Sequence, residues 1–212
     1  MPRLDRLLSL YCFSPLRKLV RSKKPAIPIL MYHSISDNPE YGVHPYYRLA
    51  TTPEVFAQHM ALLAGQGYHV IGLDAAVKFL SGDNSDNQDI PAKVIITFDD
   101  GFLDLYINAF PILARHGFTA TVFLPTSFIN DSSTSLTGRM FLSWPQVREL
   151  IKAGFTFGSH TVTHKHLDRL PRSQGKHEIQ KSKETIEDRT GSQVQSFSSP
   201  YAFPENDKDF IS

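Results

Sequence analysis

Short apolar runs alternate with amphipathic stretches along most of this chain. The apolar runs are rich in β-branched and aromatic residues and predict strands, and the stretches between them have the three-to-four-residue apolar spacing of helices. Strands are expected over residues 27–32, 68–71, 94–98, 119–124, 155–159 and 195–199, and helices over residues 53–64, 75–80, 102–116, 144–153 and 171–189. Regular alternation of strand and helix predicts an α/β fold with a parallel sheet, either open or closed into a barrel.

Residues typical of helix ends support these boundaries. Thr52 and Pro53 begin the first helix as cap and first-turn proline, and Asp74 is the expected cap of the helix over residues 75–80. Gly117 is a typical stop for the helix over residues 102–116. Trp144 lies at a helix start, where it is expected to be a packing anchor. Residues 125–140 are expected to be a loop.

The strand over residues 94–98 ends in two carboxylates and a glycine, Asp99, Asp100 and Gly101. The carboxyl ends of parallel strands are where α/β folds keep their active sites. Two adjacent carboxylates repel each other, so either one is protonated or both face a cation. Asp and Gly are also ordinary turn residues, so this stretch taken alone indicates a turn as readily as a site.

Two histidines, His160 and His164, follow the strand over residues 155–159. Side chains four residues apart share one face of a strand or a helix, so both imidazoles can reach one ion. A histidine pair with this spacing is often only a pair of hydrogen-bonded residues. With an aspartate from the other strand end, the pair predicts a catalytic metal site, because three protein ligands leave room for water.

The composition indicates one soluble α/β domain. The chain has 212 residues, of which 41% are hydrophobic and 20% charged, and these fractions are ordinary for a globular protein. Its single cysteine, Cys12, excludes an internal disulfide and is expected to pack as a small apolar residue.

Residues 1–26 differ from the rest of the chain in charge. They carry seven Lys or Arg side chains and one Asp, which gives +6, whereas the whole chain is only +1. Residues 27–212 are therefore mildly acidic, which argues against a nucleic-acid surface there. The chain is thus expected to consist of a basic amphipathic segment, 1–26, and one domain, 27–212.

The basic segment has two interpretations. Its leucines form an apolar face, so it could either lie on an anionic membrane surface or pack on the domain as a solvated helix. Its apolar run, residues 7–13, is short and interrupted by Ser9, and no small-residue cleavage site follows. We therefore expect neither a signal peptide nor a transmembrane helix, and we expect a cytoplasmic protein with peripheral membrane contact as one alternative.

Three stretches resemble, in order, the first three motifs of the NodB-type polysaccharide deacetylase family, which are metal-dependent carbohydrate esterases. They are residues 97–101 (Thr-Phe-Asp-Asp-Gly), 159–164 (Ser-His-Thr-Val-Thr-His) and 197–202 (Phe-Ser-Ser-Pro-Tyr-Ala). The resemblance covers the chain from about residue 27 onward. It implies an irregular (β/α) barrel that is incomplete at the carboxyl end, since members of the family continue past the third motif.

The resemblance also implies a reaction and a ligand set. The reaction is hydrolysis of N-acetyl groups on an acetylated polysaccharide or oligosaccharide, which breaks a non-peptide C–N bond. Asp100, His160 and His164 would hold a divalent metal, zinc by ligand type, with cobalt or nickel able to substitute. Asp99 would be the general base.

The third motif departs from the family pattern. By resemblance, the backbone N–H of Tyr201, after Pro200, would help to bind the oxyanion. Ser198 stands where the family commonly has an arginine that orients the base, and Ala202 stands where glycine is common. The histidine that protonates the leaving amine normally comes from the part of the family that follows the third motif. His33, at the end of the strand over residues 27–32, is the substitute that this sequence offers.

Three functions stay open on the sequence alone. The first is a metal-dependent polysaccharide deacetylase. The second is a truncated, inactive remnant that still binds carbohydrate, and the third is an amidohydrolase acting on a small C–N substrate. An open groove with an aromatic rim would favour a polymer over a small molecule. The loop over residues 34–51 could supply such a rim with Tyr41, Tyr46 and Tyr47.

Overall fold

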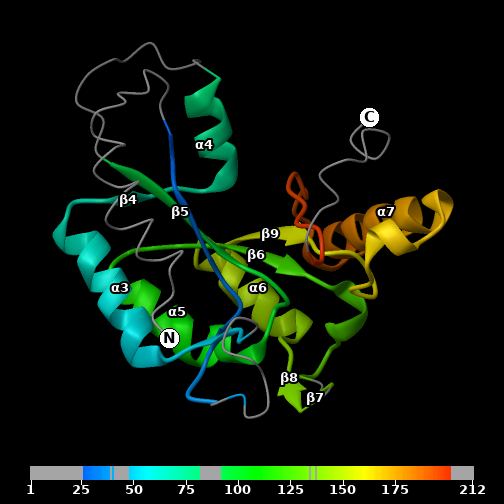
Figure 1. Ribbon diagram of the computed structural model, residues 1–212, viewed down its shortest axis with the longest axis horizontal. Coiled ribbons are helices and arrows are strands. Elements are labelled where there is room, and N and C mark those ends of the chain that lie inside the picture. The colour runs from blue at the N-terminus through cyan, green and yellow to red at the C-terminus, as the bar shows by residue number, and fades with distance from the viewer. Residues whose placement is uncertain are drawn as a thin grey trace, which may run out of the picture.

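The computed structural model describes residues 26–38, 40, 48–81, 92–133, 135–136 and 138–201. Its centre is a parallel sheet in the order β1-β5-β6-β9, with β4 also paired to β5 (Figure 1). The strands are β1 (Ile29–Tyr32), β4 (His69–Val70), β5 (Lys93–Phe98), β6 (Thr121–Leu124) and β9 (Thr156–Ser159). The predicted α/β class with a parallel sheet is confirmed. Among the described residues the strands do not close into a barrel.

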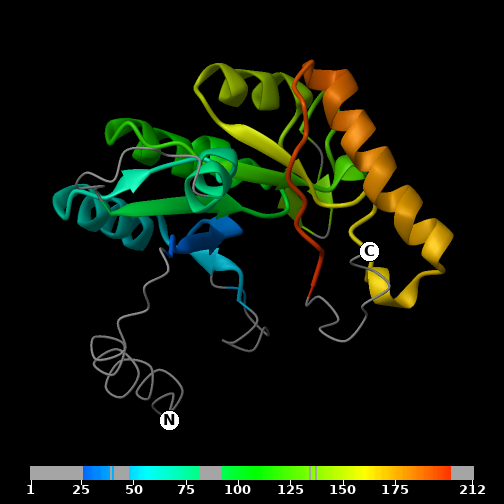
Figure 2. The same cartoon turned by 90° about the horizontal axis from the view of Figure 1, so that it is seen from above.

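Five α-helices and several short elements surround this sheet in the described part of the chain. In both views α3 lies at the opposite end of the molecule from α7 (Figures 1 and 2). The helices are α3 (Pro53–Gly65), α4 (Leu73–Leu80), α5 (Phe110–Arg115), α6 (Trp144–Lys152) and α7 (Arg172–Thr190). The short elements are β2 (Ser34–Ile35), β3 (Ala50–Thr51), η3 (Leu105–Ala109), η4 (Thr126–Phe128), β7 (Ser135–Leu136), β8 (Arg139–Met140) and η5 (Leu167–Arg169). None of the described helices combines the length and the apolar character needed to cross a bilayer.

The core lies between the sheet and the helices. Residues 94–98 of β5 are all buried, as expected of a strand covered on both faces. Phe56 and Met60 from α3 and Trp144 from α6 are also buried, which confirms Trp144 as a packing anchor. Each such side chain stabilises the fold by roughly 1.5–3 kcal/mol through burial alone.

Of the two helix caps predicted from the sequence, that of α3 is confirmed and that of α4 is not. The Thr52 side chain accepts a hydrogen bond from the Val55 N–H, and Pro53 opens α3, as predicted. The prediction that Asp74 caps the next helix is wrong, because α4 begins at Leu73 with Gly72 as its cap. Asp74 lies instead in the first turn, where its carboxylate interacts favourably with the helix dipole.

The helix predicted over residues 102–116 is interrupted. Residues Leu105–Ala109 form a π-helical turn, in which the Phe110 N–H bonds to the Leu105 carbonyl, and α5 begins only at Phe110. Pro111 has no N–H, so the i to i−4 bond at that position cannot form and the wider turn is favoured. Asp104 precedes the turn and accepts bonds from the Ser34 hydroxyl and the Ile35 N–H.

Two further predictions need correction. The expected loop over residues 125–140 contains η4 and the antiparallel pair β7 and β8. The expected strand over residues 195–199 runs beside β9 but forms only one bridge, between Ser159 and Phe197. The segment 1–25, the loop tyrosines Tyr41, Tyr46 and Tyr47, and residues 202–212, including Ala202, lie outside the described residues.

Gly158 allows β9 to approach its neighbours closely. A Cβ atom there would lie 2.5 Å from the Phe123 ring and 2.6 Å from the Ser196 hydroxyl. Gly158→Ala is therefore expected to lower the free energy of unfolding by about 1–3 kcal/mol, the usual cost of overpacking. Urea unfolding checks this, with Gly65→Ala as control because a Cβ at Gly65 meets nothing within 4 Å. Equal urea midpoints for Gly158→Ala and the wild type would show that the contact is not tight.

Candidate active site

The turn after β5 places two carboxylates at the end of the sheet. The Asp99 N–H continues the pairing with β1 by bonding to the Tyr32 carbonyl at 3.0 Å. Asp100 and Gly101 then both adopt the left-handed conformation, with φ of 69° and 65°. Glycine is required at the second of these positions, because a Cβ there would lie 2.5 Å from a methyl group of Leu124.

The two histidines lie on the loop that leaves β9. The His160 N–H bonds to the Leu124 carbonyl at 3.1 Å, which ties the start of the loop to the end of β6. Thr161 and His164 both have positive φ, 67° and 55°, and the Thr161 hydroxyl accepts a bond from the His164 N–H at 3.0 Å. This tight turn brings the two imidazoles to the same side of the loop.

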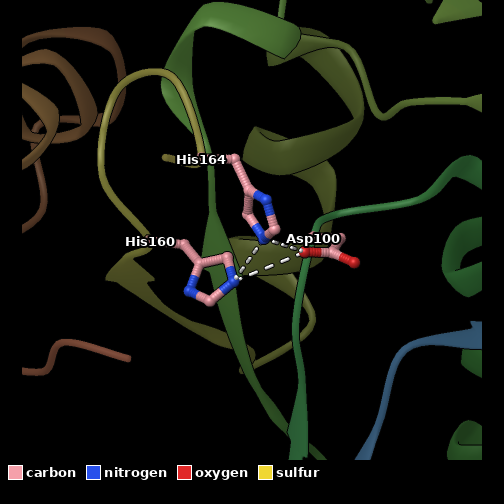
Figure 3. A group of neighbouring side chains, drawn as sticks. All are labelled: Asp100, His160 and His164. Carbon is pink, nitrogen blue, oxygen red and sulfur yellow. Dashed lines mark hydrogen bonds and ion pairs between the residues drawn. The ribbon is translucent and has the colours of Figure 1, made fainter. Parts of the chain in front are cut away.

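Asp100, His160 and His164 point toward one another (Figure 3). The Asp100 Oδ1 atom lies 3.4 Å from Nε2 of His160 and 3.0 Å from Nε2 of His164, and the two Nε2 atoms are 3.2 Å apart. A tetrahedral ion with bonds of about 2.0–2.1 Å separates its ligand atoms by roughly 3.3 Å. The three atoms therefore have the spacing of a metal site.

The hydrogen bonding of His160 supports the same conclusion. Its Nδ1 lies 2.8 Å from the Ser198 carbonyl, which can only accept, so Nδ1 carries the proton and the Nε2 lone pair can bind a cation. Oδ1 of Asp100 is buried and lacks a conventional hydrogen bond. Two nitrogens and one carboxylate oxygen form a donor set that suits zinc, cobalt or nickel.

The surroundings shift the pKa values of the two carboxylates in opposite directions. Burial raises the pKa of Asp99, while the charges of His160 and His33 act against that shift. Burial also acts to raise the pKa of Asp100, but the adjacent rings of His160 and His164 outweigh it and lower this pKa below its ordinary value. Asp100 is thus the ionised member of the pair, and a cation between its Oδ1 and the two Nε2 atoms would supply the same attraction without a proton on either Nε2.

Ser198 contacts both the predicted base, Asp99, and one of the predicted metal ligands, His160. Its hydroxyl donates to Oδ2 of Asp99 at 3.2 Å, and its carbonyl accepts from His160. The sequence indicated only that the arginine of the family is absent at this position. The structure adds that the hydroxyl in its place still contacts the predicted base.

These groups line one pocket of about 810 Å³, within the usual range of small-molecule sites of roughly 300–1,000 Å³. His33 and Tyr201 also lie in its wall, and Pro200 is buried between two lining residues without lining the pocket itself. The remaining lining residues are Met31, Leu49, Phe197, Ser198 and Ser199.

Tyr201 has a partner that the sequence did not reveal. Its ring stacks on His166 with centroids 3.6 Å apart and an angle of 6° between the planes. The side chain remains half exposed, so the stack presents a flat aromatic surface beside His164. The pairing joins two loops, and sequence spacing alone carries no signal for it.

Comparison with known proteins places the chain in a family. Residues 86–210 match the family model described as polysaccharide deacetylase. YxkH of Bacillus subtilis (strain 168), provisionally named a polysaccharide deacetylase, is 31% identical over 169 residues, which are 79% of this chain and 54% of YxkH. The bifunctional xylanase/deacetylase of Pseudobutyrivibrio xylanivorans is 26% identical over 126 residues, 59% of this chain and 19% of that protein. The chain thus spans about half or less of the length of these relatives.

Solved structures agree with the fold. The polysaccharide deacetylase BC0361 of Bacillus cereus aligns with a TM-score of 0.69 and 25% identity over 86% of this chain and 53% of its own. The deacetylase PplD of Streptococcus pyogenes, solved with acetate, aligns with a TM-score of 0.71 and 24% identity over 86% of this chain and 77% of its own. With the matched family model, these findings show that the chain belongs to the polysaccharide deacetylase family.

Proposed function

We propose that this chain is a metal-dependent hydrolase that removes N-acetyl groups from a polysaccharide or oligosaccharide. The observation that carries the proposal is the convergence of Asp100, His160 and His164 beside the buried carboxyl of Asp99. Four such groups at the carboxyl ends of parallel strands, open to one pocket, suit hydrolysis of an acyl–nitrogen bond.

Asp100, His160 and His164 would hold the ion, which we propose to be zinc, with cobalt or nickel able to replace it. When bound, the ion would polarise the amide carbonyl and make a water molecule more acidic. The bond from His160 Nδ1 to the Ser198 carbonyl keeps that ring in one orientation, so the ligand geometry is set before the ion arrives.

Asp99 would act as the general base. Its carboxyl lines the pocket beside Asp100, and the Ser198 hydroxyl holds one of its oxygens, which leaves the other to take a proton from the attacking water. The backbone N–H of Tyr201, on the pocket wall, would donate to the oxyanion that develops on the carbonyl.

His33 would protonate the departing amine. An amine leaves poorly without a proton, so the reaction needs an acid as well as a base. His33 lines the same pocket, and its charge acts on both Asp99 and Asp100. This assignment would supply the acid from the first strand rather than from a segment beyond the third motif.

The apolar part of the pocket wall favours a sugar. Met31, Leu49 and Phe197 line it together with the half-exposed ring of Tyr201. Apolar and aromatic side chains of this kind pack against the C–H faces of sugar rings.

Three expectations stay predictions from the sequence. They are the division into residues 1–26 and 27–212, the cytoplasmic location and the peripheral membrane contact.

Acetate release from N-acetylglucosamine oligomers of one to six units tests the proposal. The zinc-loaded chain is expected to release acetate and to prefer the longer oligomers, because they occupy more of the wall. Activity confined to the monosaccharide or to small amides would instead indicate an amidohydrolase of small substrates. Bound zinc without acetate from any substrate would indicate an inactive remnant.

A further inference from the structure

The buried face of α7 carries a carboxylate. Gly175, Glu178, Ser182 and Ile186 form this face, and Glu178 is only 9% exposed. A buried carboxylate is costly unless donors satisfy its oxygens. Glu178 therefore needs a specific explanation.

Glu178 accepts three hydrogen bonds from one short segment. Its Oε2 atom accepts from the N–H groups of Val162 at 2.9 Å and Thr163 at 2.8 Å, and Oε1 accepts from the Thr163 hydroxyl at 2.8 Å. Hydrogen bonds to a charged group contribute more to stability than neutral ones do. One side chain of α7 is therefore hydrogen-bonded to the backbone of two consecutive loop residues, Val162 and Thr163.

This hydrogen-bonded segment lies between His160 and His164, the two histidines of the site. It consists of Val162 and Thr163, and the residue on each side of it, Thr161 and His164, has positive φ. Such a conformation is strained for a non-glycine residue and needs support from its surroundings. On the other side, the Ser127 N–H bonds to the Val162 carbonyl at 2.9 Å, so the loop is held between η4 and α7.

We infer that Glu178 is a positioning residue that sets the distance between the His160 and His164 rings and thereby the affinity of the site for its metal. The inference rests on the proposed metal role of those histidines. Glu178 is not among the converging ligand atoms, so it acts only through the loop backbone. Without its carboxylate, the N–H groups of Val162 and Thr163 would lose their acceptor and the loop could relax, which would move His164 away from Asp100.

Zinc affinity of matched variants tests this inference without relying on catalysis. Glu178→Ala removes both acceptor oxygens, whereas Glu178→Gln keeps one oxygen for the two N–H groups and presents an NH₂ group to the Thr163 hydroxyl, which can also accept. Glu184→Ala is the control, since Glu184 lies on the same helix with 60% of its side chain exposed. Competition with a chromophoric chelator gives each dissociation constant, and circular dichroism gives the folded fraction.

We expect Glu178→Ala to weaken zinc binding by about 10- to 100-fold, the usual effect of removing a group that supports metal ligands. Glu178→Gln and Glu184→Ala should stay close to the wild type. The absorption spectrum of bound cobalt should change in Glu178→Ala, because the ligand geometry changes. A lower melting temperature with unchanged zinc affinity would show that Glu178 only stabilises the fold.

Two outcomes separate this inference from the proposed function. If the wild type binds no zinc, both the metal site and the inference fail. If the wild type binds zinc and folded Glu178→Ala binds it equally well, the inference alone fails. Should Glu178→Ala not fold, Glu178→Asp replaces it, because the shorter side chain cannot reach both loop residues, and unchanged affinity in that variant would also overturn the inference.

Discussion

Asp99→Asn is expected to reduce acetate release by roughly 100- to 10,000-fold, the usual contribution of a general base, while the protein keeps its zinc. The amide has nearly the shape of the carboxylate, but it cannot take a proton from water. The Ser198 hydroxyl can still donate to the amide oxygen, so the pocket should keep its form. Zinc content and kcat, measured on the same preparation, check both parts of this result.

The matched control for this variant is Asp188→Asn, an exposed aspartate on α7. It removes the same charge far along the chain from the predicted base and should leave kcat unchanged. Turnover retained in Asp99→Asn would refute the role of Asp99. Loss of zinc together with turnover would instead make Asp99 part of the metal site.

His33→Ala is expected to reduce acetate release from the sugar amide by about 100- to 10,000-fold, because the amine would have to leave without a proton. The loss should be much smaller with 4-nitrophenyl acetate, whose leaving group needs no proton. Comparing kcat for the two substrates therefore separates acid catalysis from a general disturbance of the pocket.

His177→Ala, at an exposed position on α7, is the control for the loss of a histidine. An equal loss on the amide and the ester in His33→Ala would mean that His33 shapes the pocket rather than donating a proton. Unchanged rates on both substrates would remove His33 from the mechanism.

The sequence predicted the sheet and the ends of its strands because the signals there are local. A run of buried apolar residues and two carboxylates lie within eight consecutive residues, and the histidines share one face by spacing alone. The Thr52 cap of α3 was predicted for the same reason. Asp74 failed as a cap because a carboxylate serves a first turn as well as a cap position.

The features that the sequence did not predict depend on contacts between distant segments. Glu178 looks like any charged helix residue until the loop over residues 161–164 is folded against α7. A spacing of Gly175, Glu178, Ser182 and Ile186 along one helix face is the signal that could have indicated its burial. The Ser198 bond to Asp99 spans 99 residues, and no local pattern encodes it.

The measurement that tests the account most directly is acetate release from N-acetylglucosamine oligomers by one preparation in three states: zinc-loaded, stripped by a chelator, and returned to one equivalent of zinc. The account predicts release, loss and recovery in that order, because Asp100, His160 and His164 are proposed to hold the ion that the reaction needs. Folded protein that binds one zinc and releases no acetate in any state would contradict it.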